Sequence, residues 1–97
     1  MLDQLKQLKN LRSQAKQLQQ ELADVQVTGT GADGKVTVTL DGNQNVQSVS
    51  IDPSLMQPDD REVLERGVQQ AFEDGMVQLR SLMAQKMSAG GLNLPSV

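Results

Sequence analysis

The chain has 97 residues, which fits one small domain over residues 1–97, because most domains run to about 100–150 residues. It contains no cysteine and no histidine, so disulfide frameworks, thiolate zinc sites and the usual general base near neutral pH are excluded. With no tryptophan, no tyrosine and one phenylalanine, it lacks an aromatic platform for stacking single-stranded bases. No apolar run approaches the roughly 18 residues of a membrane span, so we expect a cytoplasmic protein without a membrane partner.

Charge is unevenly distributed along the chain. The formal net charge is −3, yet residues 1–20 hold four basic residues against Asp3 alone, a net charge of +3. The rest of the chain holds five basic and eleven acidic residues, a net charge of −6. The basic stripe, as we call the four basic residues near the N-terminus, consists of Lys6, Lys9, Arg12 and Lys16.

Residues 1–24 have the pattern of an amphipathic helix. Between Leu2 and Asp24 there is no Gly or Pro, and good helix formers such as Leu, Gln, Lys and Ala dominate. Apolar residues recur at alternating spacings of three and four, which places them on one side of a helix. This apolar seam consists of Leu8, Leu11, Ala15, Leu18, Leu22 and Val25. At about 100° per residue, the basic stripe centres roughly 145° away from the seam.

Residues 25–52 alternate with a period of two, and Val and Thr replace Leu and Gln, as half-buried strands require. The connecting residues 29–34 and 41–45 are rich in Gly, Asn and Asp, which favour turns. The pattern therefore predicts a three-stranded antiparallel meander. Val46 is out of phase with Val49, which predicts a bulge or an early end of the turn. The alternating positions are Val25 and Val27, then Val36, Val38 and Leu40, then Val49 and Ile51.

A second long helix is predicted over residues 58–89, because Pro58 suits a first helical position and apolar residues then keep helical spacing. Gly90 and Gly91 end it, and residues 90–97 are expected to be a flexible tail. From Asp59 to Met87 such a helix would be about 43 Å long, whereas a compact chain of this size has a radius of gyration near 13 Å. The helix overhangs its own domain, so we expect self-association.

Two motifs resemble ligand sites only in part. Gly29, Gly31 and Gly34 have the spacing of the dinucleotide fingerprint, but a strand pattern follows where a helix must hold the pyrophosphate. Asp41 and Asn43 begin like a calcium loop, but strands flank them and the later ligand positions do not match. Hairpin turns explain both motifs.

The remaining polar cluster is Asp59, Asp60 and Glu62, which has no accompanying base, nucleophile or ligand set and is interpreted as helix capping. We therefore predict no enzyme activity, no cofactor, no metal site and no small-molecule substrate.

Small residues occur at every fourth position of the second helix, at Gly67, Ala71 and Gly75. Each glycine costs roughly 1 kcal/mol in helix propensity, and close approach of another helix would offset this cost. The alternative is that two glycines are simply tolerated in a marginal helix.

The basic stripe also allows two interpretations. It is either a solvated face that keeps the helix soluble or a binding surface for phosphates, which needs several cations close together and no base-specific geometry.

Segments spread over nearly the whole chain, taken in order, resemble the YbaB/EbfC family of bacterial nucleoid-associated proteins. The most specific of them is the I-D-P-S-L sequence after the third predicted strand. The segments are Val27-Thr28-Gly29, residues 35–42, Val49-Ser50-Ile51-Asp52-Pro53-Ser54-Leu55, Ala71-Phe72 and Gly91-Leu92-Asn93-Leu94-Pro95.

The resemblance implies an α+β protomer of order α-β-β-β-α and a homodimer in which the sheets join and the long helices project like tweezers. It also implies binding of double-stranded DNA in the nucleoid, with little or modest sequence preference, and no catalysis. Members of the family commonly have a Gly/Met/Lys-rich arm before the first helix and basic residues before the I-D-P element. This chain starts almost at the helix and has Gln47 and Ser48 there, so we expect low DNA affinity.

We therefore expect a homodimeric architectural protein that binds double-stranded DNA. The alternative is a dimeric interaction module or chaperone-like adaptor whose apolar helix arms bind protein, for which Met76, Met83 and Met87 would supply an adaptable surface. Lys86 also suits a role as partner of a helix C-terminal dipole. The predicted DNA-binding residues are Lys6, Lys9, Arg12 and Lys16, followed by Arg80 and Lys86.

Overall fold

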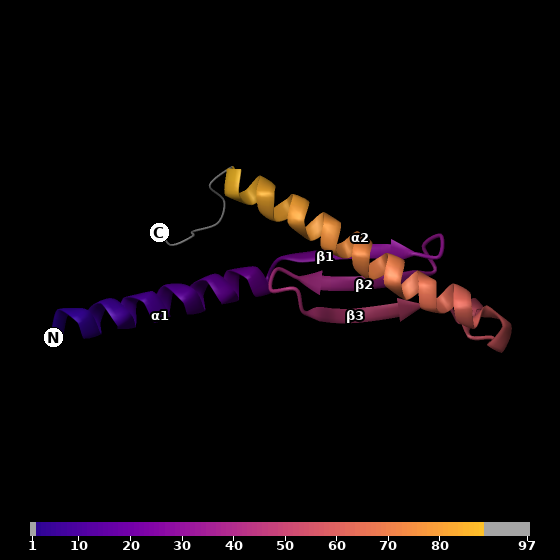
Figure 1. The fold of residues 1–97 in the computed structure, drawn as a ribbon, viewed down its shortest axis with the longest axis horizontal. Coiled ribbons are helices and arrows are strands. Elements are labelled where there is room, and N and C mark those ends of the chain that lie inside the picture. Colours follow the sequence, from indigo (N-terminus) through magenta and orange to yellow (C-terminus); the bar gives the residue numbers. More distant parts are fainter. Residues whose placement is uncertain (1, 89–97) are drawn as a thin grey trace.

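The computed structural model describes residues 2–88 and shows a helix, three strands and a second long helix in chain order (Figure 1). Two short 3-10 turns, Pro53–Leu55 and Pro58–Asp60, lead from the last strand into the last helix. The predicted α-β-β-β-α order of an α+β protein is confirmed, and the predicted tail lies outside the described residues. The elements are α1 (Leu2–Ala23), β1 (Gln26–Gly31), β2 (Val36–Asp41), β3 (Val46–Ile51) and α2 (Arg61–Ser88).

The strands form one antiparallel sheet in the order β1-β2-β3. β1 runs as far as Gly31, so Gly29 and Gly31 belong to a strand, and only Gly34 of the three glycines lies in the predicted hairpin loop. Gly34 has a φ of 87°, which favours glycine. The register shifts where Leu40 pairs with Val46, which confirms the bulge.

The hydrophobic core lies between one face of the sheet and α2. Val36, Val38 and Leu40 alternate along β2 toward this face and are fully buried. Leu55 of the first 3-10 turn and Ala71 of α2 complete the cluster. α2 packs on β1 and β2 and leaves β3 largely uncovered.

The small residues of α2 face β1, so the expectation that they approach another helix is wrong. A Cβ added at Gly29 would overlap the backbone of Ala71 and Gly75, and one added at Gly31 would overlap the carbonyl of Gly67. Glycines on the strand therefore meet small residues on the helix, and the two backbones approach each other directly. The spacing of small residues predicts which side of a helix another element can approach closely. It does not predict whether that element is a helix or a strand.

The molecule is elongated because α1 points away from the sheet (Figure 1). Its extents are 65 × 26 × 16 Å and its radius of gyration is 18.5 Å, well above the value of about 13 Å for a compact chain of this length. Within residues 2–88, neither helix combines the length and the apolar character that crossing a membrane requires.

Candidate nucleic-acid interface

The basic stripe lies on α1, which stands clear of the rest of the protomer. None of its 22 residues is buried, and within residues 2–88 no other helix or strand packs along it. The N-terminal half of the apolar seam is exposed as well, with Leu8 and Leu11 more than half exposed, whereas Leu18 and Leu22 are half-buried and Val25 is buried. In the protomer, α1 is therefore an arm with a charged side and an apolar side.

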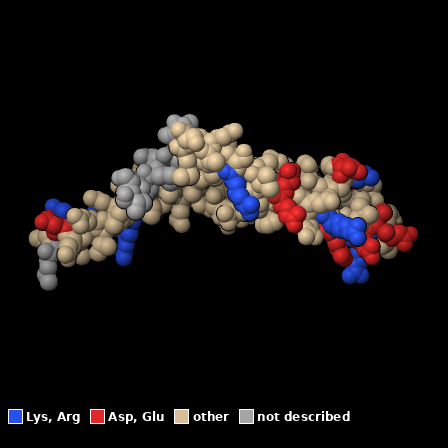
Figure 2. Space-filling model, turned by 45° about the horizontal axis from the view of Figure 1, so that its top comes forward, with Lys and Arg blue, Asp and Glu red and all other residues tan. Residues whose placement is uncertain are grey.

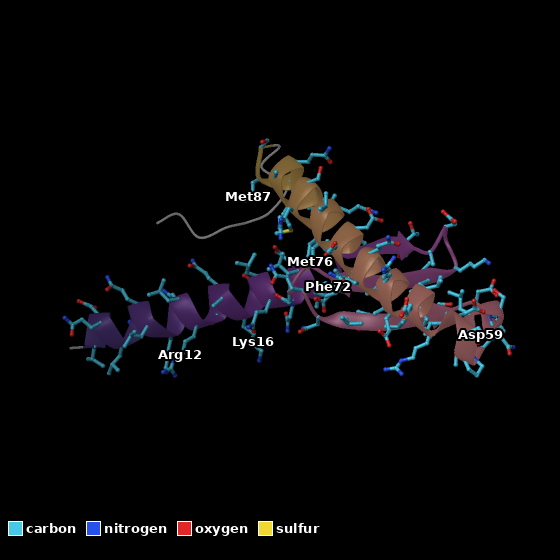
Figure 3. The ribbon with its side chains drawn as sticks, turned by 45° about the vertical axis from the view of Figure 1, so that its right-hand side comes forward. Arg12, Lys16, Asp59, Phe72, Met76 and Met87 are labelled. Atoms are coloured by element: carbon cyan, nitrogen blue, oxygen red, sulfur yellow. The ribbon has the colours of Figure 1, made fainter. Side chains whose placement is uncertain are left out.

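All four side chains of the basic stripe are exposed. From Lys6 to Lys16 the stripe spans eleven residues, about 15 Å along the helix axis. Arg12 and Lys16 extend from the same side of α1, away from α2 (Figure 3). The only salt bridge found within residues 2–88 joins Arg61 to Glu65, so no described acidic side chain forms a salt bridge with the stripe.

The two further predicted residues lie on the other helix. Arg80 is exposed, whereas Lys86 is half-buried in the last turn of α2, where a cation also suits the negative end of the helix dipole. Because α1 and α2 do not pack along each other, the six predicted residues occupy two separate arms and do not form one cluster.

Charge differs sharply between the arms and the body of the molecule. Residues 21–75, which hold the end of α1, the sheet and the first half of α2, carry three basic and eleven acidic residues, a net charge of −8. Residues 76–97 carry two basic residues and no acidic one, a net charge of +2. On the face shown in Figure 2, acidic side chains gather over the body, apart from one group at the tip of α1. A polyanion is thus attracted to the arms and repelled by the body.

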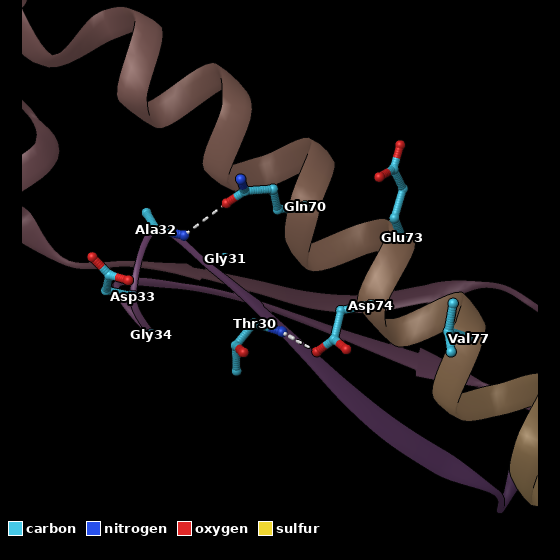
Figure 4. A pocket seen from close by; sticks show the side chains of 9 residues that line it. All are labelled: Thr30, Gly31, Ala32, Asp33, Gly34, Gln70, Glu73, Asp74 and Val77. Carbon is cyan, nitrogen blue, oxygen red and sulfur yellow. Dashed lines mark hydrogen bonds between the residues drawn. The ribbon is translucent and has the colours of Figure 1, made fainter.

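A hollow of about 510 Å³ beside the turn between β1 and β2 belongs to the acidic body (Figure 4). Asp33, Glu73 and Asp74 line it, and no basic residue does. Asp74 Oδ2 accepts a hydrogen bond from Thr30 N at 2.9 Å, and Gln70 Oε1 accepts one from the N–H that follows β1 at 3.2 Å. These bonds occupy main-chain donors that β2 leaves free, and the surrounding carboxylates disfavour a phosphate.

No metal site accompanies these carboxylates. Within the described part of the chain, no group of three or more acidic side chains is placed to hold a metal ion.

The root of α1 contacts the turn between β2 and β3. The N–H of Gly42 donates to the carbonyl oxygens of Leu22 at 2.8 Å and Val25 at 3.0 Å, and Asn43 Nδ2 donates to the carbonyl oxygen of Gln19 at 3.1 Å. Sequence reasoning identified residues 41–45 as a turn but missed its contact with the helix. No local sequence pattern predicts this contact, because the residues that form it are about twenty positions apart in the sequence.

Comparison with known proteins gives a consistent result. The model of the YbaB/EbfC DNA-binding family matches residues 1–92. The nucleoid-associated protein of Nitrobacter hamburgensis is 43% identical over 96 residues, which cover 97% of this chain and 91% of that protein. A nucleoid-associated protein of Rhodospirillum rubrum is 41% identical over 93 residues, which cover 94% of this chain and 87% of that protein.

A solved structure also resembles the fold. The crystal structure of an uncharacterized protein from Helicobacter pylori matches with a TM-score of 0.61 and 25% identity, over 82% of this chain and 96% of that chain. Since the family model matches nearly the whole chain and two relatives exceed 40% identity over most of their length, the chain belongs to the YbaB/EbfC DNA-binding family.

Proposed function

We propose that the protein is a homodimer that binds double-stranded DNA in the nucleoid, mainly through phosphate contacts and with little sequence preference. The observation that carries this proposal is α1, a helix without a buried residue that presents four exposed cations on one side. Membership of a family named for DNA binding, and not for catalysis, supports DNA as the partner of this stripe.

The stripe has suitable dimensions for the DNA backbone. Duplex DNA carries about one negative charge per 1.7 Å of its axis, so a stripe of about 15 Å faces on the order of nine phosphates. Lys and Arg contact phosphates without reading base edges, so such binding carries little sequence information. The contacts come from one helix side, which leaves the apolar seam of α1 free for packing.

A second copy of the chain would find an open strand edge at β3. At the outer edge of β1, Thr30 N donates to Asp74, and Ala32 N just after the strand donates to Gln70, whereas within residues 2–88 no hydrogen bond to the outer edge of β3 is found. Exposed strand edges tend to pair with a further strand. Val46 and Val49 of β3 are 49% and 50% exposed, and Phe72 of α2 is 41% exposed. Pairing two β3 edges would join the sheets and cover this apolar surface.

The dimer matters for function because it doubles the number of cations available to one duplex. Two stripes present up to eight cations, and about 0.9 counterion released per contact sets a limit of roughly −7 for the log-log slope of affinity against salt. The acidic body opposes binding, so we expect a slope shallower than this limit and weak affinity at physiological salt.

The proposal is tested by titrating the unmodified protein with two duplexes of unrelated sequence over a range of salt concentrations. Binding at low salt with the same slope on both duplexes, no steeper than roughly −7, is expected. A preference of more than about tenfold for one duplex would contradict phosphate-based binding, since it corresponds to about 1.4 kcal/mol of base discrimination.

One observation favours a second candidate function. Four leucines of α1, at positions 2, 5, 8 and 11, are all more than half exposed. Such a row could bind an apolar surface of another protein, as a dimeric adaptor would. If the unmodified protein does not bind either duplex even at low salt, this adaptor function replaces DNA binding as the better explanation.

A further inference from the structure

The direction of α1 depends on very few contacts. No other helix or strand of the described chain packs along it, and none of its residues is buried. A short link, Asp24-Val25, connects it to β1. Beside the half-buried side chains of Leu18 and Leu22, the hydrogen bonds from Gly42 and Asn43 are the directional contacts that tie the end of α1 to the sheet.

One of these bonds falls where a helix needs a partner. The last four carbonyl groups of an α-helix lack helical donors, and Leu22 is among these residues in α1. Gly42 supplies an N–H to this carbonyl, which also accepts one from Val25 N at 3.1 Å, and Asn43 donates to the carbonyl of Gln19, one turn earlier. A Cβ added at Gly42 would lie 2.6 Å from the carbonyl oxygen of Leu22, so a side chain at this position would push the helix away.

Asp41 holds the turn that makes these bonds. It is only 2% exposed, and its carboxylate accepts hydrogen bonds from Asn43 N at 2.8 Å, Asn45 N at 3.0 Å and Gln47 Nε2 at 2.6 Å. These donors, Asn45 N most of all, lower the pKa of Asp41 below its usual value because they favour the charged form. The carboxylate therefore stays ionised near neutral pH and fixes the turn in one shape.

We propose that the Asp41–Asn43 segment positions the α1 arm, so that the basic stripe is presented to DNA in a fixed direction. Asp41 orders the turn, and Gly42 and Asn43 transmit this order to the helix. The DNA part of this inference rests on the function proposed above, whereas the geometric part does not.

A fixed direction matters because the arm is long. Lys6 lies 17 residues from the C-terminal end of α1, about 25 Å along the helix axis, so a rotation of about 20° at the root would displace it by about 9 Å. Such a displacement exceeds the length of a hydrogen bond severalfold. A loose root would thus prevent the cations from meeting phosphates together.

The geometric part is tested with spin labels, because the chain contains no cysteine of its own. Cysteines introduced by Asn10→Cys on α1 and Gln69→Cys on α2, both at exposed positions, report the distance between arm and body. Labelled chains are diluted into an excess of unlabelled chains so that only pairs within one protomer are measured. We expect one narrow distance distribution for the unmodified protein and a clearly broader one for Asn43→Ala and for Asp41→Ala.

The matched control is Asp52→Ala. Asp52 caps its own turn in the same way, since its Oδ1 accepts a hydrogen bond from Ser54 N at 2.8 Å, but this turn belongs to the 3-10 segment after β3. The distribution should stay narrow in this control. Asn43→Ala leaves every bond of the Asp41 carboxylate in place, so it decides the question even if Asp41→Ala does not fold.

The functional part is tested on the same variants by titration with duplex DNA at low salt. As a control, sedimentation must first show that the Asn43→Ala variant has the same mass as the unmodified protein. We expect its dissociation constant to rise at least about fivefold, which corresponds to the loss of roughly one hydrogen bond, and its salt slope to become shallower.

A distance distribution as narrow as that of the unmodified protein would overturn the positioning role, and so would a broad distribution with unchanged DNA affinity. If no form of the protein binds DNA, the proposed function fails, while the distance measurement still decides how the arm is held.

Discussion

Glycine at two positions of β1 determines how closely α2 can lie on the sheet. Gly29 and Gly31 leave no room for a Cβ, since the atoms it would meet are backbone atoms of α2, which cannot move aside as a side chain can. Gly67 and Gly75 on the helix are less tightly constrained, because their nearest neighbours are ends of side chains at 3.0 Å. The strand glycines therefore fix the approach of the two elements.

We predict that Gly29→Ala costs about 3 kcal/mol of unfolding free energy, at the upper end of the range for overpacking, because backbone must shift to relieve the overlap. Gly34→Ala is the comparison. It places a Cβ in open space, at a residue with a φ of 87°, so it carries only the cost of a left-handed conformation, about 1 kcal/mol. Denaturation in urea measures both. A loss for Gly34→Ala equal to or larger than that for Gly29→Ala would contradict this account.

At the scale of single residues, the sequence predicts where a bulge or a turn lies better than it predicts which residues those features contact. The bulge near Val46 follows from the broken alternation and is confirmed. The turn that contains Asp41 and Asn43 was also predicted, because Asp, Gly and Asn favour turns. The contact of this turn with Gln19 was not predicted, since it joins residues that are distant in the sequence.

At the scale of elements, the period of the apolar residues predicted both helices and all three strands. The same period could not show what covers the seam of α1, because it identifies an apolar side but not its partner. In the described part of the chain, no other helix or strand packs along that side. For β3, alternation at Val49 and Ile51 predicted a half-buried strand, yet Val46 and Val49 remain half exposed because α2 lies over the other two strands.

These exposed elements lead to a prediction about assembly. The unmodified protein is expected to sediment as a dimer at micromolar concentration. Val49→Lys should weaken the dimer, because it places a charge in the apolar surface beside the β3 edge. Ser50→Lys, the neighbouring substitution on the opposite face of the same strand, should have little effect. A stable monomer of the unmodified protein in sedimentation equilibrium, or a dimer equally strong in both variants, would show that β3 is not the contact.

At the scale of the whole molecule, function is proposed to follow from the separation of charge. A chain with a net charge of −3 is an unexpected partner for DNA, but the body carries −8 and the two arm segments carry +3 and +2. Sequence arithmetic showed that the N-terminus is basic. Only the structure shows that this segment projects as an arm away from the acidic body, so that a duplex can approach it without lying along the carboxylates of the sheet and the start of α2.

The central claim is that the basic stripe of α1, and not the overall charge, binds DNA. Two triple variants with the same net charge test it most directly. Lys9, Arg12 and Lys16 are changed to Gln in one, and Lys35, Arg61 and Arg66, which are exposed residues of the body, are changed to Gln in the other.

Both variants are titrated with one duplex over a range of salt concentrations, after circular dichroism and sedimentation have shown unchanged fold and mass. The stripe variant is expected to bind more weakly, with a salt slope shallower by up to about 2.7 per protomer, because up to three phosphate contacts are lost at about 0.9 counterion each. The body variant should keep the slope of the unmodified protein. Equal losses in the two variants, or a stripe variant that binds as the unmodified protein does, would contradict the claim.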